Sequence, residues 1–235
     1  MRLDQFTSQA LNVSRKTAKK LIKNGDIEVN QTPSSANTYL AKTDKVYFQN
    51  QLISLPQPMH FALHKPKGFV CSNIDEHYPS ILRLIPKSSL VYHIAGRLDV
   101  DTTGLVIITN DSNLCHRIIS PKQKIKKSKT YHVILAKPLD RSAQSLLEKG
   151  IMLKGESKIT APCNIEKQND LISITLYEGR YHQIKRMFAA IGNHVEHLHR
   201  VQVGAVKLGG LQAKQYRPLT QSEYCSFFNQ NEDNQ

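Results

Sequence analysis

A short acidic stretch in the middle of the chain has residues that could carry out chemistry. Asp99 and Asp101 lie in a turn-prone segment rich in glycine and threonine, and the apolar run Leu105–Thr109 follows at once. That run predicts a buried strand. The acidic side chains would then stand on a rigid base, as a positioned catalytic carboxylate requires. The alternative is a loop whose Asp and Thr side chains only cap and turn the chain.

A second stretch could supply a cation to that carboxylate. A turn at Glu178–Gly179 precedes apolar residues at helical spacing, which predicts a helix that reaches Phe188. Lys185 and Arg186 would point away from the apolar side of this helix. If either cation lies beside Asp99, its charge holds the carboxylate in the ionised form and orients it. A purely structural ion pair would give the same sequence pattern.

The overall charge predicts a polyanionic partner. Lysine and arginine number 32 against 19 acidic residues, which gives a net charge of +13 over 235 residues. This excess favours nucleic acid as the partner. No apolar run approaches the roughly 20 residues of a spanning helix, and the first residues lack a signal peptide. We therefore expect a cytoplasmic protein without membrane contact. The four cysteines are far apart, so we expect free thiols.

The N-terminal region contains a short basic helix. Ser14 is a good N-cap and Gly25 a good terminating glycine, so residues 15–24 are predicted to be helical. One face of this helix is apolar and the other is cationic. We predict phosphate contacts for the cationic face, with a merely solvated face as the alternative. The cationic residues are Arg15, Lys16, Lys19, Lys20 and Lys23.

The order of the expected elements favours an α+β fold with a largely antiparallel sheet, because several strands are separated by turns and few helices intervene. We expect a small N-terminal domain at 1–56, a linker at 51–60 and a larger domain at 57–235, with a disordered polar tail from about 229 and a lysine-rich loop at 122–129. The expected strands are 26–30, 45–48, 61–64, 69–71, 105–109, 130–135 and 171–176. The expected helices are 3–11, 15–24, 80–85, 142–149 and the one ending at Phe188.

Residues 1–50 resemble the small RNA-binding module, of the alpha-L type, first described in ribosomal protein four of the small subunit. The cap, the basic helix, the glycine and the following strand occur in the same order in this chain. The resemblance implies RNA binding and no chemistry.

Four further motifs resemble those of RNA pseudouridine synthases, in the subgroup that acts on ribosomal RNA and carries such an N-terminal module. The motifs are HKPKGFV, GRLDVDTTGL, KTYHV and EGRYHQIKRMF, and the match spans nearly the whole chain. The resemblance implies an α+β core with a long mixed sheet and a central cleft, and it implies no cofactor and no metal. It also implies a monomer whose partner is small-subunit (16S) ribosomal RNA or the assembling small subunit, with uridine 516 as the target.

The resemblance assigns roles to individual positions. Asp99 matches the catalytic aspartate, Tyr131 the tyrosine under the target base, and Lys185 the cation paired with the aspartate. Arg97 matches a residue that assists base flipping. The predicted RNA-binding residues are Arg97, Arg15, Lys16, Lys19, Lys20, Lys23, Arg180 and Arg186.

Other functions fit parts of the sequence. A non-catalytic RNA-binding assembly factor fits the composition, although RNA binding gains nothing from an acid such as Asp99 in a basic cleft. The same reaction on a large-subunit or transfer RNA uridine is a further alternative. A metal-dependent nuclease would use three carboxylates as magnesium ligands, namely Asp99, Asp101 and Asp111. A zinc site is not expected, because nothing nearby completes a tetrahedral set around His194, His197 and His199.

Overall fold

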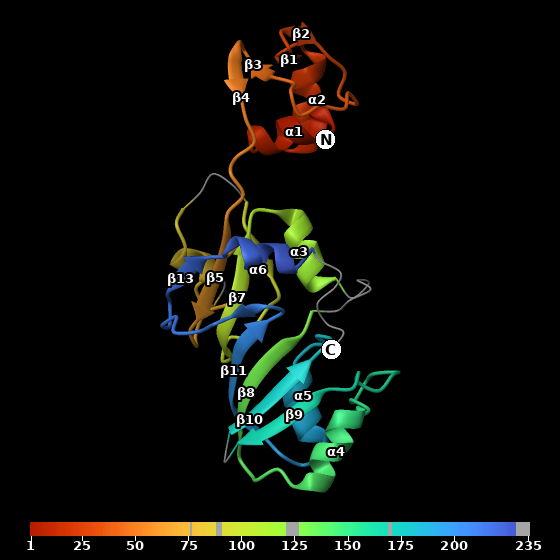
Figure 1. Cartoon of the computed structure of the whole chain (residues 1–235), viewed down its shortest axis with the longest axis vertical. Coiled ribbons are helices and arrows are strands. Elements are labelled where there is room, and N and C mark those ends of the chain that lie inside the picture. Colours follow the sequence, from red (N-terminus) through yellow and green to blue (C-terminus); the bar gives the residue numbers. More distant parts are fainter. Residues whose placement is uncertain (76, 88–90, 121–126, 169–170, 229–235) are drawn as a thin grey trace. The chain divides into compact units, whose positions relative to one another are not determined.

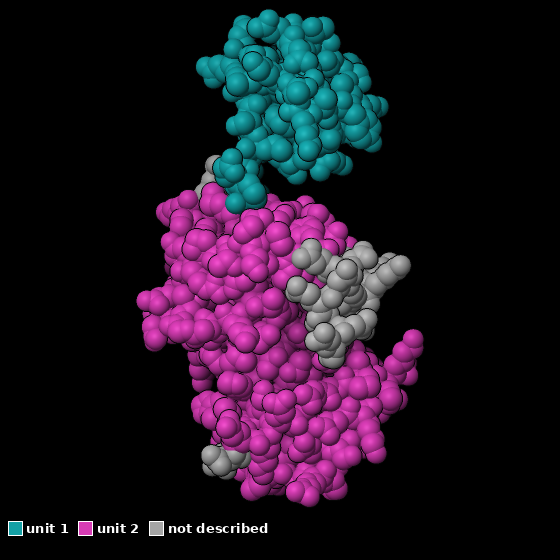
Figure 2. Space-filling view, viewed as in Figure 1, with its two compact units in different colours: residues 1–58, 88–91 teal, residues 59–87, 92–235 magenta. Residues whose placement is uncertain are grey.

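The computed structural model describes residues 1–75, 77–87, 91–120, 127–168 and 171–228. The chain divides into two compact units, residues 1–58 with 88–91 and residues 59–87 with 92–235 (Figure 2). Most of the lysine-rich loop, 122–126, and the tail 229–235 lie outside the described residues. No helix in the described part of the chain is long and apolar enough to cross a membrane.

The first unit packs two helices against a small antiparallel sheet of order β2-β1-β3-β4. Ser14 Oγ accepts a hydrogen bond from the Thr17 amide at 3.1 Å and starts α2, and Gly25 follows its end at a φ of 82°. The core consists of Leu3, Ile22, Ile27, Val29 and Val46. The elements are α1 (Leu3–Ala10), α2 (Arg15–Lys23), β1 (Ile27–Val29), β2 (Thr32–Pro33), β3 (Val46–Phe48) and β4 (Gln51–Ile53).

The prediction of a linker over the whole of 51–60 is wrong at both ends. Residues Gln51–Ile53 form β4, which pairs with β3 at the edge of the small sheet. His60 already belongs to the first strand of the second unit. A three-residue strand is too short to show alternation in the sequence, and the prolines that suggested a linker, Pro56 and Pro58, follow it.

The second unit is built on one mixed sheet with helices against it (Figure 1). Its elements are β5 (His60–Lys65), η1 (Ile81–Leu84), β6 (His93–Ala95), β7 (Thr103–Thr109), α3 (Ser112–Ile119), β8 (Lys129–Leu135), α4 (Arg141–Lys149), β9 (Asn164–Gln168), β10 (Leu171–Leu176), α5 (Gln183–Ala190), β11 (Val195–Val203), β12 (Val206–Lys207), β13 (Tyr216–Pro218) and α6 (Gln221–Ser226).

The strand order confirms the α+β prediction. The main path of the sheet runs β13-β5-β7-β11-β8-β10-β9, with β6 paired to β7 and β12 to β11. Among the described strands, β7 and β11 pair in parallel and the other pairs are antiparallel. The parallel pair lies at the centre of the sheet. It aligns His199 with Thr103 and Arg200 with Gly104, so the first residues of β7 pair directly with β11.

Side chains of β7 alternate between two cores, one on each face of the sheet. Val106 and Ile108 belong to a large core that α4 and α5 cover, and Leu105 and Ile107 belong to a smaller core beneath α3 and α6. Figure 1 shows α3 and α6 beside β5 and β7, and α4 and α5 beside β9 and β10. Because β7 is buried on both faces, the turn before it has a rigid base.

One prediction about the second unit is wrong, and three of its elements were not predicted. Residues 69–71 form no strand, since Val70 makes only an isolated bridge to Ser80 and Gly68 turns the chain at a φ of 84°. Asp99 and Asp101 lie, as expected, in the turn that precedes β7. The elements that were not predicted are β6, α3 and β9.

Candidate active site

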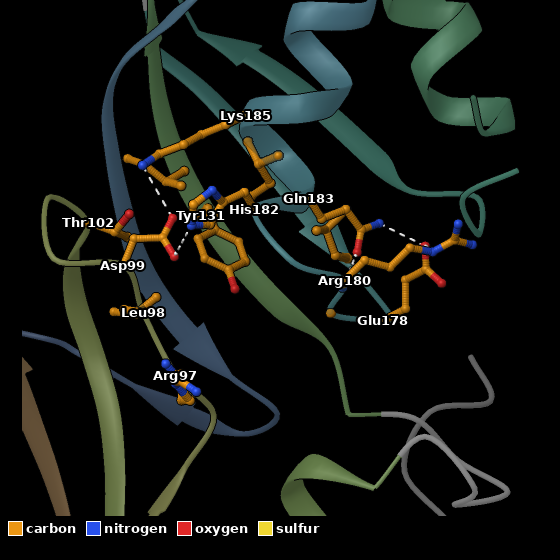
Figure 3. Close-up of a pocket in the computed structure, with 14 residues that line it drawn as sticks. Arg97, Leu98, Asp99, Thr102, Tyr131, Glu178, Arg180, His182, Gln183 and Lys185 are labelled. Carbon is orange, nitrogen blue, oxygen red and sulfur yellow. Dashed lines mark hydrogen bonds and ion pairs between the residues drawn. The ribbon is translucent and has the colours of Figure 1, made fainter. Parts of the chain in front are cut away.

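The two chemically suggestive stretches meet in one pocket of the second unit (Figure 3). The turn before β7 contributes Asp99, β8 contributes Tyr131, and the start of α5 contributes Lys185. Arg97 and Arg180 also line the pocket. The pocket therefore brings together the three residues predicted to be catalytic and two of those predicted to bind RNA.

Two nitrogen groups hold the Asp99 carboxylate, one on each oxygen. Lys185 Nζ lies 3.2 Å from Asp99 Oδ2, and His182 Nε2 lies 3.2 Å from Oδ1. Figure 3 shows both side chains pointing at the carboxylate. The Asp99 side chain keeps 29% of its surface exposed, so it is oriented and still open to a substrate. This geometry suits a positioned catalytic carboxylate.

Lys185 also binds Asp101, at 2.7 Å and 2.9 Å from its two oxygens. Burial alone would lower the pKa of Lys185, but the hydrogen bond to Asp101 and the attraction of both carboxylates outweigh it and raise that pKa. Burial likewise opposes the change at Asp101, whose pKa the Lys185 ammonium lowers overall. Both groups are therefore charged near neutral pH, and the ammonium is shared between two carboxylates.

Tyr131 forms the buried side of the pocket. Its side chain is 9% exposed and belongs to the large core. Four apolar side chains line the pocket with it, namely Leu98, Leu176, Ile184 and Leu198. A flat ring in an apolar setting is a suitable support for a nucleobase taken out of its stack.

The other predicted RNA-binding residues fall into different settings. Arg97 is exposed at the pocket, and Figure 3 shows it apart from the Asp99 cluster. Arg180 donates to the carbonyls of Lys158 and Ile159 at 2.8 Å and 2.6 Å, and Arg186 binds Glu156 at 2.9 Å. Both arginines thus tie the segment after α4 to the start of α5. Arg186 does not contact Asp99, so between the two candidate cations the structure selects Lys185.

The five basic residues of α2 lie in the first unit, and all of them are exposed. Ala18 and Ile22, on the opposite face of the helix, are buried. Lys19 Nζ lies 3.9 Å from the buried carboxylate of Asp4, and this contact leaves the ammonium exposed. The cationic face is therefore available to a phosphate backbone.

Sequence reasoning missed three residues that shape the pocket: Lys65, His182 and Arg200. His182 has a φ of 47°, a left-handed conformation that places its ring beside Asp99. Lys65 is fully buried, and its Nζ donates to the carbonyls of Thr102 (2.7 Å), Pro66 (3.1 Å) and Val100 (3.3 Å). Burial lowers the pKa of Lys65 to about 8. The HKPKG motif was the only signal for Lys65.

The magnesium alternative requires Asp111 beside Asp99 and Asp101, but the fold separates Asp111 from the other two. Asp111 lies beyond the far end of β7 and caps α3, accepting a hydrogen bond from the Asn113 amide at 2.8 Å. Of the histidines considered for a zinc site, His199 has its Nδ1 hydrogen-bonded to Thr103 Oγ1 at 2.7 Å. Within the described residues there is no group of three or more His, Cys, Asp or Glu side chains arranged to hold a metal ion.

Comparisons with known proteins show the family to which this fold belongs. A family model described as RNA pseudouridylate synthase matches residues 59–190. The chain belongs to the RNA pseudouridylate synthase family, whose members are isomerases that modify RNA.

Relatives of known name match nearly the whole chain. The ribosomal small subunit pseudouridine synthase A of Haemophilus influenzae is 42% identical, over 95% of this chain and 97% of that protein. The protein of the same name from Escherichia coli K12 is 40% identical, over 96% of this chain and 99% of that one. A crystal structure of a pseudouridylate synthase matches with a TM-score of 0.70 and 40% identity, over 97% of this chain and 99% of that one.

Proposed function

We propose that the protein converts one uridine of small-subunit (16S) ribosomal RNA to pseudouridine, with Asp99 as the catalytic carboxylate. The observation that carries this proposal is the Asp99 carboxylate held between Lys185 and His182 at a pocket that Tyr131 closes. The choice of RNA rests on the names of the full-length relatives, which are small-subunit enzymes. The expected target is uridine 516.

The reaction rearranges bonds without changing oxidation state. The bond from N1 of uracil to the anomeric carbon breaks, the base turns, and a bond from C5 to the anomeric carbon forms. C5 loses a proton and N1 gains one, so the atoms balance without a cofactor. Asp99 serves either as a nucleophile at the anomeric carbon or as a base on the ribose, and the proposal includes both routes.

The target uridine must leave its stack to reach Asp99, which costs a few kcal/mol. We assign two residues to this step. The ring of Tyr131 supports the base inside the pocket, and its hydroxyl takes part in removal of the C5 proton. Arg97, exposed at the pocket, assists the flipping and contacts the RNA backbone.

Substrate selection is assigned to two domains. Residues 1–56 act as an RNA-binding domain through the cationic face of α2, and residues 57–235 act as the catalytic domain. The net charge of +13 supports a polyanionic partner, either free 16S RNA or the assembling small subunit. We expect a monomer that acts in the cytoplasm.

The first prediction tests Asp99 with a matched neighbour. Asp99→Asn removes the charge at nearly constant size, so pseudouridine formation should fall below detection while RNA affinity and folding persist. Asp101→Asn, two residues away and 52% exposed, also removes a carboxylate from Lys185 but should keep most of the activity. The measurement is pseudouridine formed on 16S RNA transcripts, with and without EDTA. Turnover by Asp99→Asn, or inactivation by EDTA on folded RNA, would contradict the proposal.

A further inference from the structure

Arg200 is a buried cation whose hydrogen bonds all go to neutral oxygens. Its side chain is 1% exposed, and no carboxylate in the described residues forms an ion pair with it. Nε donates to the Leu105 carbonyl at 2.7 Å, and Nη2 donates to the Gly96 carbonyl at 3.0 Å. Buried charges in proteins are usually paired, because an unpaired charge is costly to remove from water. A cation kept here without an acid therefore calls for an explanation.

The carbonyl contacts of Arg200 lie on both sides of Asp99 in the sequence. Gly96 precedes the aspartate and Leu105 follows it, so one side chain holds both ends of the segment that carries Asp99. The parallel pairing of β7 and β11 brings the Arg200 backbone against Gly104. A Cβ atom at Gly104 would lie 2.2 Å from the Arg200 carbonyl oxygen, so only glycine permits this approach.

The same guanidinium reaches the aromatic side of the pocket. Arg200 and Tyr131 are partners across β11 and β8, and Nη1 lies 3.5 Å from the Tyr131 hydroxyl, at the long limit of a hydrogen bond. The central carbon of the guanidinium lies 5.9 Å from the centroid of the Tyr131 ring. Arg200 thus connects the segment carrying the carboxylate to the ring that supports the base.

We propose that Arg200 is a positioning residue, which fixes the Asp99 segment and the Tyr131 hydroxyl relative to each other for the reaction proposed above. The inference rests on that proposed function. The fork of the guanidinium sets the geometry through its carbonyl contacts, and its charge favours negative charge that develops on the base or on the Tyr131 oxygen. An arginine suits this task because its donors are planar and it stays charged.

Two variants each remove one property of the guanidinium. Arg200→Lys keeps the charge and loses the fork, whereas Arg200→Gln keeps an amide donor and loses the charge. Arg217→Lys is the matched control, since Arg217 holds the Lys207 and Pro218 carbonyls and Glu223 in the same unit and does not line the pocket. Two quantities are measured for each variant: the single-turnover rate at saturating RNA and the dissociation constant for the RNA. The rate is normalised to the amount of protein that is able to bind RNA.

Both Arg200 variants should lower the saturating rate by about 10- to 100-fold, the cost of a misplaced reactive group. Their affinity for the RNA should stay within about threefold of wild type, and Arg217→Lys should match wild type in both. A purely structural role would reduce the amount of folded protein and leave the rate per competent molecule unchanged. A saturating rate within about twofold of wild type for either folded Arg200 variant would overturn the inference.

A spectroscopic measurement tests the inference without turnover. With fluorotyrosine incorporated, the ¹⁹F resonance of Tyr131 is identified by its absence in Tyr131→Phe. Arg200→Gln should shift or broaden this resonance, and Arg217→Lys should leave it in place. An unchanged resonance in Arg200→Gln would refute the positioning role. If wild type forms no pseudouridine, the proposed function fails, and this spectrum still decides whether Arg200 positions Tyr131.

Discussion

At the level of single residues, the pocket shows how a basic protein can present one usable carboxylate. Lys185 is shared between Asp99 and Asp101, and the shorter contact goes to Asp101. The ammonium therefore orients Asp99 without being its exclusive partner. His182 takes the second oxygen of Asp99, so the carboxylate is fixed from two sides. We expect removal of either contact to disturb the orientation of Asp99 more than the stability of the fold.

The second prediction concerns the charge of Lys185. Lys185→Met removes the ammonium that lies 3.2 Å from one oxygen of Asp99, so the carboxylate should lose its orientation. The single-turnover rate at saturating RNA should then fall by about 10- to 100-fold, the cost of a misplaced reactive group. Lys185→Arg keeps a charged donor and should retain more of this rate than Lys185→Met does. Equal saturating rates for Lys185→Met and wild type would show that Lys185 does not act on Asp99.

The third prediction separates the two roles of Tyr131. Tyr131→Phe keeps the ring that supports the base and removes the hydroxyl. RNA should still bind, whereas product formation should fall by about 100-fold or more, as expected when an acid–base group is lost. Tyr181→Phe is the control, because Tyr181 is 76% exposed and does not line the pocket. Normal turnover by Tyr131→Phe would reduce Tyr131 to a stacking platform.

At the level of elements, α2 is the clearest candidate for sequence-independent RNA contact. The fourth prediction is that neutralising Lys16, Lys19 and Lys23 together weakens RNA binding and flattens its salt dependence. Each lost phosphate contact lowers the slope by about 0.7 to 0.9, so the total change is about 2 to 3. The rate at saturating RNA should be nearly unchanged. Neutralising three other exposed lysines, Lys42, Lys137 and Lys149, should change the slope less. Equal slopes for the helix variant and wild type would mean that α2 faces solvent.

Elements with local signals were predictable from the sequence. The cap at Ser14 and the terminating Gly25 defined α2, and the run of apolar residues defined β7. Helix α3 also had a signal, since Asp111 is its N-cap and buried Leu114 and Ile118 follow at helical spacing. The Asp111 side chain, a ligand in the magnesium alternative, instead caps α3. Strands as short as β4 and β6 have too few residues to show a period.

Contacts set by tertiary structure had no local signal. Lys185 beside Asp99 was expected through the family resemblance, whereas His182 on the other oxygen was not. The position of His182 depends on a left-handed backbone conformation that a sequence does not reveal. Arg200 lies inside β11, where a buried arginine is rare and depends on carbonyls from β7 and the preceding turn.

At the level of the whole molecule, the proposed RNA-binding face of α2 and the candidate active site belong to different units. The exposed lysines of α2 lie in the first unit, and the pocket lies in the second. RNA affinity and the chemical step should therefore respond to different substitutions. An assembly factor that only binds RNA would have no chemical step, so no substitution could lower a reaction rate while leaving its RNA affinity unchanged.

The most direct test of the central claim is a map of pseudouridines in ribosomal RNA from cells that lack this gene, made with a reagent that marks the modified base. We predict that one pseudouridine, at position 516 of 16S RNA, disappears in these cells. Wild-type protein should restore it and Asp99→Asn should not. A map that is unchanged in the deletion strain, or full restoration by Asp99→Asn, would contradict the account.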